Sequence, residues 1–195
     1  MRHLGKTINF EFEFCATPGR SWPVLSVLVN NFQISTHTIT DRNRTVSVDL
    51  FFDSGVNNIN LYYFSKQESE TVVENGVIVA DQTLELRCVH ADGILLESWF
   101  WTDHYYLPWY FSGFRRQNPN APETLPSQLV WHFPGRYRMM NLPDSKDFWS
   151  WYQTQRTERV LKNLVDPSGQ IRANHQPMDQ EDHQLITEIK KLINV

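Results

Sequence analysis

Asp103 and His104 form an adjacent acid–base pair in the middle of this sequence. A carboxylate beside an imidazole can orient the ring and assist proton transfer. More often, such a histidine lies on an aromatic loop while the aspartate caps a turn. The sequence contains no G-x-S-x-G, phosphate-binding loop, H-E-x-x-H or C-x-x-C motif. We therefore predict no catalytic residue and a protein that is not an enzyme.

Oxygen-bearing side chains gather near several predicted turns. Asp53, Asn57 and Asn58 lie around one turn, and Asp81 and Asp92 lie at strand ends. Calcium needs six to eight oxygen ligands, often spaced as D-x-D-x-D, and that spacing does not occur here. Asp and Asn also favour turns for conformational reasons alone. The sequence therefore predicts no metal ligand and no cofactor.

An aromatic cluster between residues 99 and 110 is the strongest sign of ligand binding. Aromatic rings offer large flat apolar faces on which sugar rings can stack, while nearby polar side chains bind the hydroxyls. We name four candidate carbohydrate-binding residues: Trp101, Tyr105, Tyr106 and Trp109. The alternative, left open by the sequence, is that these side chains pack in the core beneath the C-terminal segment.

The segments that position this cluster have the residue patterns of short strands. Phe10, Phe12 and Phe14 alternate with Glu11 and Glu13, as in a strand with one buried face. Similar patterns predict strands at residues 24–29, 32–35, 46–52, 59–63, 84–88 and 94–101. Turn signals at Asn30-Asn31, Asn75-Gly76 and Asp92-Gly93 separate them. This spacing predicts a mainly β fold, an antiparallel β-sandwich of jelly-roll type over residues 1–112.

The pattern changes after residue 112. For residues 113–143, the sequence predicts a Pro-rich connector with a possible extra strand near residues 129–133. For residues 144–195, it predicts a helical C-terminal region. Short helices are marginal alone and need a surface on which to bury their apolar side. That surface is either the protein's own domain or a partner. The candidate partner-binding residues are Trp149, Trp151, Tyr152, Leu185, Ile189 and Leu192.

Composition limits the possible partners. The chain has 195 residues, of which 41% are hydrophobic and 21% charged, with a formal net charge of −4. No basic run is present, so neither nucleic acid nor an anionic membrane surface is expected as a partner. No apolar run reaches the ~18 residues of a membrane helix, and the N-terminus lacks an apolar leader, which predicts folding in a cytoplasm. We expect Cys15 and Cys88 to be buried reduced thiols, with Cys88 on the apolar face of Leu84 and Leu86.

Three segments carry a resemblance to a known class of proteins. Residues 22–30 (Trp22-Pro23-Val24 to Asn30), 55–61 (Gly55 to Leu61) and 74–81 (Glu74 to Asp81) resemble the jelly-roll β-sandwiches in virion proteins of tailed bacteriophages. They are similar, more loosely, to calcium-dependent xylan-binding modules, although no calcium-ligand set is matched here. The resemblance covers about residues 7–110.

The resemblance implies a non-enzymatic structural component of a phage virion, in the tail, baseplate or capsid surface. Its partners would be other virion proteins and copies of itself, and the C-terminal region would attach it. A carbohydrate-binding module for a host-surface polysaccharide is the first alternative. A polysaccharide hydrolase is the second.

Overall fold

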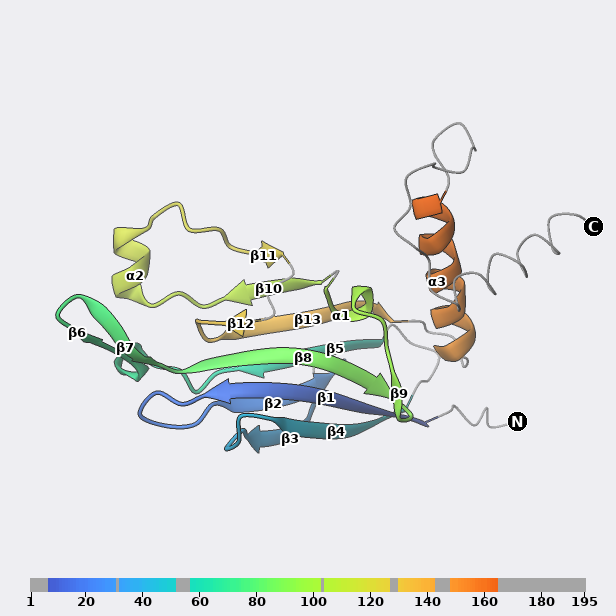
Figure 1. Ribbon diagram of the computed structural model, residues 1–195, viewed down its shortest axis with the longest axis horizontal. Coiled ribbons are helices and arrows are strands. Elements are labelled where there is room, and N and C mark those ends of the chain that lie inside the picture. Colours follow the sequence, from blue (N-terminus) through green and yellow to red (C-terminus); the bar gives the residue numbers. More distant parts are fainter. Residues whose placement is uncertain are drawn as a thin grey trace, which may run out of the picture. The chain divides into compact units, whose positions relative to one another are not determined.

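The computed structural model describes residues 7–30, 32–51, 57–102, 104–126, 130–142 and 148–164. The chain divides into two compact units, Met1–Lys146 and Asp147–Val195. Antiparallel strands make up most of the first unit (Figure 1).

Two sheets form the body of the first unit. Sheet A has the strand order β12-β8-β1-β4, with β9 paired to β8. Its strands are β1 (Thr7–Thr17), β4 (Arg44–Phe51), β8 (Thr83–Ala91), β9 (Ile94–Leu95) and β12 (Val130–Trp131). Sheet B has the order β11-β10-β13-β5-β2-β3. Its strands are β2 (Val24–Val29), β3 (Phe32–Thr38), β5 (Asn57–Tyr63), β10 (Tyr105–Pro108), β11 (Leu125–Pro126) and β13 (Gly135–Leu142).

The remaining elements are short, apart from the last helix. Strands β6 (Thr71–Glu74) and β7 (Val77–Asp81) form a separate two-stranded hairpin. The helices are η1 (Glu68–Glu70), α1 (Trp99–Thr102), α2 (Ser112–Gln117) and α3 (Phe148–Leu164). Among the described residues, no helix is long and apolar enough to cross a membrane.

Alternation along the strands builds the core, because successive side chains point to opposite faces of a sheet. The buried residues of sheet A include Phe10, Phe12, Phe14, Val46, Val48, Leu50, Leu84, Leu86, Val89 and Ala91. Those of sheet B include Leu25, Val27, Ile59, Leu61, Tyr63, Tyr106, Tyr137 and Met139. The predicted antiparallel β-sandwich is confirmed.

The predicted turns are present where the structure describes them. Asn75 and Gly76 join β6 to β7 with φ of 51° and 79°, and Asp92 and Gly93 have φ of 49° and 77°. Asn30 likewise has a positive φ of 49°, while Asn31 lies outside the described residues. Asn, Asp and Gly tolerate this left-handed conformation better than other residues, so these turns could be predicted from local sequence.

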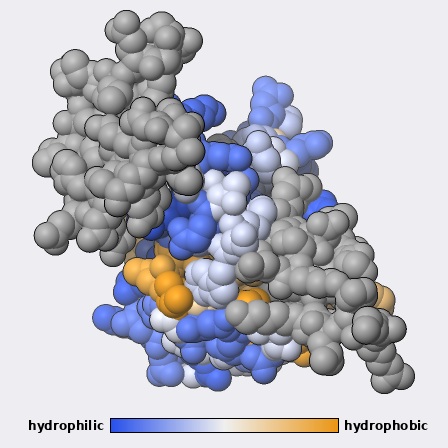
Figure 2. Space-filling model, turned by 90° about the vertical axis from the view of Figure 1, so that its right-hand side faces the viewer, coloured by the Kyte–Doolittle hydropathy of each residue, from blue (hydrophilic) through white to orange (hydrophobic). Residues whose placement is uncertain are grey.

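The predicted strand at residues 94–101 is wrong beyond Leu95. The chain instead turns into α1, with Phe100 N–H donating to the carbonyl of Glu97 at 2.9 Å. The adjacent side chains of Phe100 and Trp101 are both buried, which the alternation of a strand would not allow. Ile94 and Leu95 of β9 remain exposed. At the end of the sandwich where β9 lies, hydrophobic atoms gather in a small area among hydrophilic ones (Figures 1 and 2).

The sandwich also extends past the predicted boundary at residue 112. Strand β13 lies within sheet B, between β10 and β5, and buries Tyr137 and Met139. The predicted connector 113–143 therefore contains α2, β11, β12 and a central strand. Four of its prolines, Pro119, Pro122, Pro126 and Pro134, precede β13, and the alternation from Gly135 onward is that of an interior strand.

Cys88 is not on the apolar face, in contrast to the prediction. Strand pairing passes from Glu13 opposite Cys88 to Phe14 opposite Leu86, so Arg87 is an extra residue in β8. Such a bulge reverses the parity of the strand. Val89 and Ala91 are therefore buried, and Cys88 is half-buried on the outer face of sheet A. Both cysteines are free thiols, and Cys15 is also half-buried.

The second unit contains α3, which confirms the helix predicted after residue 144. Phe148 and Tyr152 are buried and stack at 6.1 Å between ring centroids, as expected for residues four apart on a helix. Trp149 and Trp151 are half-buried. The other three candidate partner-binding residues, Leu185, Ile189 and Leu192, lie outside the described residues.

A carboxylate anchors two loops at one end of the sandwich. The Glu70 side chain accepts hydrogen bonds from the backbone N–H groups of Arg20 (2.6 Å) and Ser21 (3.0 Å) and from the Ser21 hydroxyl (2.9 Å). Burial raises the pKa of Glu70, but these hydrogen bonds and the Arg20 charge outweigh it and lower the pKa below its ordinary value. Gly19 permits the close approach, since a Cβ there would lie 2.4 Å from the Glu70 carbonyl oxygen.

We predict that Glu70→Gln lowers the free energy of unfolding by about 1–2 kcal/mol near neutral pH, because a charged acceptor of three hydrogen bonds is lost. A lowered folded-state pKa stabilises the fold above the unfolded value of about 4.3 and loses that effect as the pH falls through the folded value. The difference in the free energy of unfolding between wild type and Glu70→Gln should therefore become smaller at acidic pH. Urea unfolding at several pH values measures this difference. A difference that does not change with pH would contradict the stabilising role of the Glu70 carboxylate.

Candidate functional site

The outer face of sheet B presents side chains in rows that run across the strands. Cross-strand pairing aligns Leu107 with Arg136, Arg136 with Tyr62, Tyr62 with Ser26, and Ser26 with Thr36. Directly opposite residues on one face lie about 4.5–5.5 Å apart at Cβ. One continuous row therefore crosses five strands and combines an aromatic ring, an arginine and two hydroxyls.

Trp109 contacts Tyr62, a member of this row, and the two rings form an aromatic platform. Their ring centroids are 5.7 Å apart, with an interplanar angle of 51°. Arg136 contacts the Tyr62 ring at 5.8 Å and donates from Nη1 to the Tyr62 hydroxyl at 3.2 Å. The backbone N–H of Trp109 donates to the carbonyl of Pro134 at 2.7 Å. These contacts fix the rings while Trp109 remains 46% exposed.

A small open pocket of about 390 Å³ adjoins the platform. Tyr62 and Phe64, which is 46% exposed, supply its aromatic side. Its polar side is a hydrogen-bonded chain, with Ser26 and Thr36 hydroxyls 2.7 Å apart and Gln33 Nε2 donating to Thr36 at 3.0 Å. We use the name sheet B platform for the aromatic pair and this pocket together, that is for Trp109, Tyr62, Arg136, Phe64, Ser26, Thr36 and Gln33. It can offer stacking surfaces and hydroxyl and amide groups to a polar, flat-faced ligand.

The structure separates the four predicted carbohydrate-binding residues into two pairs. Tyr105 is 57% exposed. It faces the same side of sheet B as Trp109, because the two residues are four positions apart along β10 and the segment that follows it. Trp101 and Tyr106 are in the core, at 6% and 1% exposure, so they have almost no surface to offer a ligand. Tyr106 stacks on Trp131 at 5.2 Å and donates to the Phe133 carbonyl at 2.5 Å.

Two aromatic residues of the site were not among the predicted ones. Tyr62 and Phe64 lie on β5 and just after it, at positions that alternate with the buried Leu61 and Tyr63. In the sequence, this part of the platform is therefore indicated by aromatic residues at the outward-facing positions of an alternating strand. Of the adjacent residues Asp103 and His104, which we did not predict to be catalytic, Asp103 lies outside the described residues, and the His104 ring packs edge-on against Tyr137 at 6.2 Å.

A larger cavity of about 680 Å³ lies beside the β6–β7 hairpin and α2. Its lining includes three phenylalanines, Phe111, Phe114 and Phe133, and the polar residues Lys66, Glu68, Asp81 and His132. Asp81 accepts from Lys66 Nζ and from the Thr71 hydroxyl, both at 2.5 Å, and lies 3.4 Å from His132 Nδ1.

The Lys66–Asp81 ion pair determines what this cavity can do. The Lys66 side chain is almost fully buried, so its charge depends on Asp81 for compensation. The Asp81 carboxylate also accepts from the Thr71 hydroxyl, so two neighbouring groups hold it in place. The pair is therefore better explained as a structural element than as catalytic machinery.

Two structures of one carbohydrate-binding module resemble the chain. The structure of vCBM60 in complex with galactobiose aligns with a TM-score of 0.45 and 10% identity, covering 68% of this chain and 98% of the module. A selenomethionine form of vCBM60, from work on two families of calcium-dependent carbohydrate-binding modules, aligns with a TM-score of 0.46 and 10% identity over 69% of this chain and 91% of that one. No family model matches the sequence, and no curated protein matches it.

The adjacent residues Tyr105 and Tyr106 give a matched pair for testing these positions. We predict that Tyr106→Ala lowers the free energy of unfolding by about 3–5 kcal/mol, as large-to-small changes in a core do. Tyr105→Ala should change it by less than about 0.5 kcal/mol because its ring is mostly in solvent. Chemical denaturation of both variants checks this, and equal losses would place both rings in the core.

Proposed function

We propose that this protein is a carbohydrate-binding protein that recognises a polysaccharide through the sheet B platform. The observation that carries the proposal is the contact between the half-exposed Trp109 and Tyr62 rings beside a hydrogen-bonded hydroxyl and amide cluster. Sugars need both elements, because their ring faces are apolar while their edges carry hydroxyl groups. The proposed role is binding without cleavage.

Rigidity supports this assignment. Tyr62, Ser26 and Arg136 stand on paired interior strands of sheet B, so the backbone ladder fixes their positions before a ligand arrives. A preformed surface avoids the entropy cost of ordering loops on binding, which otherwise reduces affinity. Weak stacking contacts can then give useful affinity when a long polymer spans several of them.

The charge of the platform favours an acidic polysaccharide. Arg136 and Arg138 are neighbours on the outward parity of β13, and the outward residues paired across from them are Leu107, Tyr62, Tyr105 and Asn60. None of these carries a negative charge, although the whole chain has a formal net charge of −4. Guanidinium groups bind carboxylates and sulfates through paired hydrogen bonds. Uronic-acid or sulfated polymers therefore suit this face better than neutral ones.

We predict that Trp109→Ala and Tyr62→Ala each reduce polysaccharide affinity by about tenfold or more, since a lost stacking ring removes more than about 1.4 kcal/mol of binding free energy. Phe32→Ala is the matched control, because Phe32 is an exposed aromatic residue of the same sheet outside the platform. Affinity electrophoresis against acidic and neutral polysaccharides measures all three. Retained binding by both platform variants, at unchanged melting temperature, would refute the site.

We propose as a second candidate function that the protein is a structural component of a bacteriophage virion, in contact with other virion proteins or copies of itself. The observation that favours it is the β6–β7 hairpin, whose apolar side chains Val73, Val77, Ile78 and Val79 are exposed. Exposed apolar side chains that adjoin one another are uncommon on monomeric proteins and are typical of protein–protein contacts.

The double variant Val77→Thr/Val79→Thr tests this second proposal. Threonine keeps the β-branched shape that suits a strand but replaces an apolar methyl by a hydroxyl group. We expect several-fold lower incorporation into particles in competition with wild type, at an unchanged melting temperature. Ile94→Thr, an exposed apolar position on β9, is the control. Equal incorporation of all three proteins would contradict an assembly role for the hairpin.

A further inference from the structure

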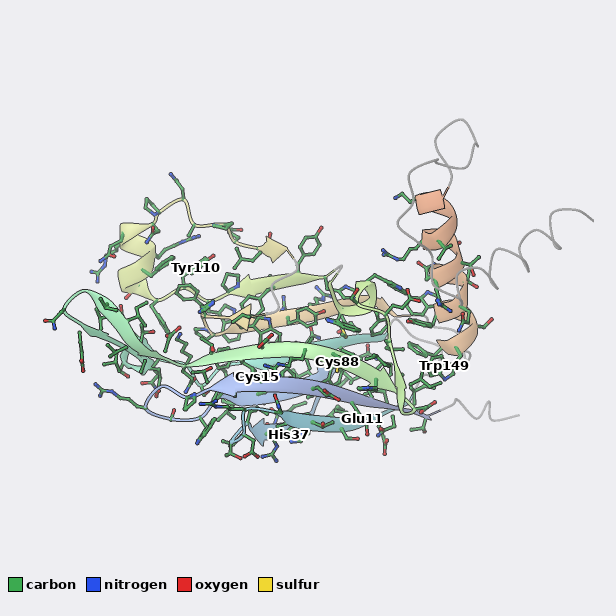
Figure 3. The ribbon with its side chains drawn as sticks, viewed as in Figure 1. Glu11, Cys15, His37, Cys88, Tyr110 and Trp149 are labelled. Carbon is green, nitrogen blue, oxygen red and sulfur yellow. The ribbon has the colours of Figure 1, made fainter. Side chains whose placement is uncertain are left out.

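Three side chains of different metal-binding chemistry meet on the outer face of sheet A. Glu13 comes from β1, and Cys88 and His90 come from β8. Their carboxylate oxygen, sulfur and ring nitrogen all lie within 4.8 Å of one another. Figure 3 labels Cys88, together with Cys15 and Glu11, on these two neighbouring strands. We call Glu13, Cys88 and His90 the sheet A triad.

Strand pairing sets the geometry of the triad. Glu13 is directly opposite Cys88, and His90 follows Cys88 by two residues, so all three point to the same side of the sheet. His90 Nδ1 is 3.7 Å from Glu13 Oε1. The bulge at Arg87 is essential here, because without its extra residue Cys88 and His90 would face the core.

His90 provides the second observation. Its Nδ1 atom is shielded from solvent and has no hydrogen-bond partner. Buried polar atoms are almost always satisfied by a donor, an acceptor, water or an ion, so this nitrogen needs an explanation. A cation between Nδ1 and the neighbouring carboxylate would satisfy it.

Cys88 fits the same explanation. It is directly opposite Glu13 in the strand pairing, and its sulfur lies within 4.8 Å of the ligand atoms of Glu13 and His90. A divalent cation reverses the local charge balance and binds the thiolate directly.

We propose that Glu13, Cys88 and His90 bind one zinc ion. Zinc takes sulfur, nitrogen and carboxylate oxygen together in a tetrahedral arrangement, whereas calcium and magnesium take oxygen ligands. Three protein ligands leave the fourth position for water or another ligand. The site joins β1 to β8 and lies on the opposite sheet from the sheet B platform, so it is independent of polysaccharide binding.

Cobalt substitution gives the sharpest test, because a thiolate bound to Co²⁺ has a charge-transfer absorption that other ligands lack. The full chain contains two cysteines, so any such band comes from Cys88 or Cys15. We expect the band in wild type and in Cys15→Ser, which changes the other half-buried thiol of the same sheet, and its loss in Cys88→Ser. No band in wild type, or a band that survives in Cys88→Ser, would overturn the proposal.

Zinc affinity then tests the other two ligands. Glu13→Gln and His90→Ala should each weaken zinc binding by at least about tenfold, as measured by competition with a chelating dye. Glu11→Gln is the matched control, since Glu11 lies on the same face of β1 and is paired with His90 but is not in the triad. Zinc should raise the melting temperature of wild type and of this control, but not of the triad variants. Unchanged affinity in both triad variants would refute the site, and melting of each metal-free variant verifies its fold.

Discussion

The two-layer packing of the sandwich imposes one constraint on every long strand, which is that alternate side chains must fill a shared apolar core. In β1, three phenylalanines satisfy it without interruption, and all three are fully buried. The residues between them are then forced outward, whatever their chemistry. Glu13 is exposed to the outer face for this reason, and Tyr62 is placed on the outer face of the other sheet in the same way. Both candidate sites are therefore by-products of how the core is filled.

A bulge is the one local device that changes this parity without breaking the sheet. Arg87 is the extra residue in β8, and the strand buries Leu86 before it and Val89 after it. The apolar alternation resumes with the opposite parity, and the side chains of Cys88 and His90 are carried to the outer face of the sheet beside Glu13. Bulges are common next to functional sites because they redirect side chains in this way. The sequence shows this bulge as a break in the apolar alternation, because Leu84 and Leu86 are two residues apart but the next buried residue, Val89, follows after three.

Local features of the chain were predictable, and long-range ones were not. The turns at Asn75-Gly76 and Asp92-Gly93 depend on residues that tolerate positive φ, so dipeptides are enough to predict them. The strand β13 depends on pairing with β5, more than 70 positions earlier, which no local pattern reveals. Tyr105 and Tyr106 show the same limit at the site. Alternation predicts that they face opposite ways, but only the packed sheets show which one faces the core.

The two candidate sites differ in how the fold supports them. On sheet B, the Trp109 and Tyr62 rings contact each other and Arg136 makes a cation–π contact with Tyr62, so the surface is formed before a ligand arrives. On sheet A, a thiol, a carboxylate and an unsatisfied ring nitrogen lie close together, and the proposed cation would join all three. A rigid paired backbone supports both sites, because binding side chains on adjacent strands keep their spacing and no loop has to become ordered. One scaffold can thus hold a preformed binding face and a metal-dependent cross-strand link on opposite sheets.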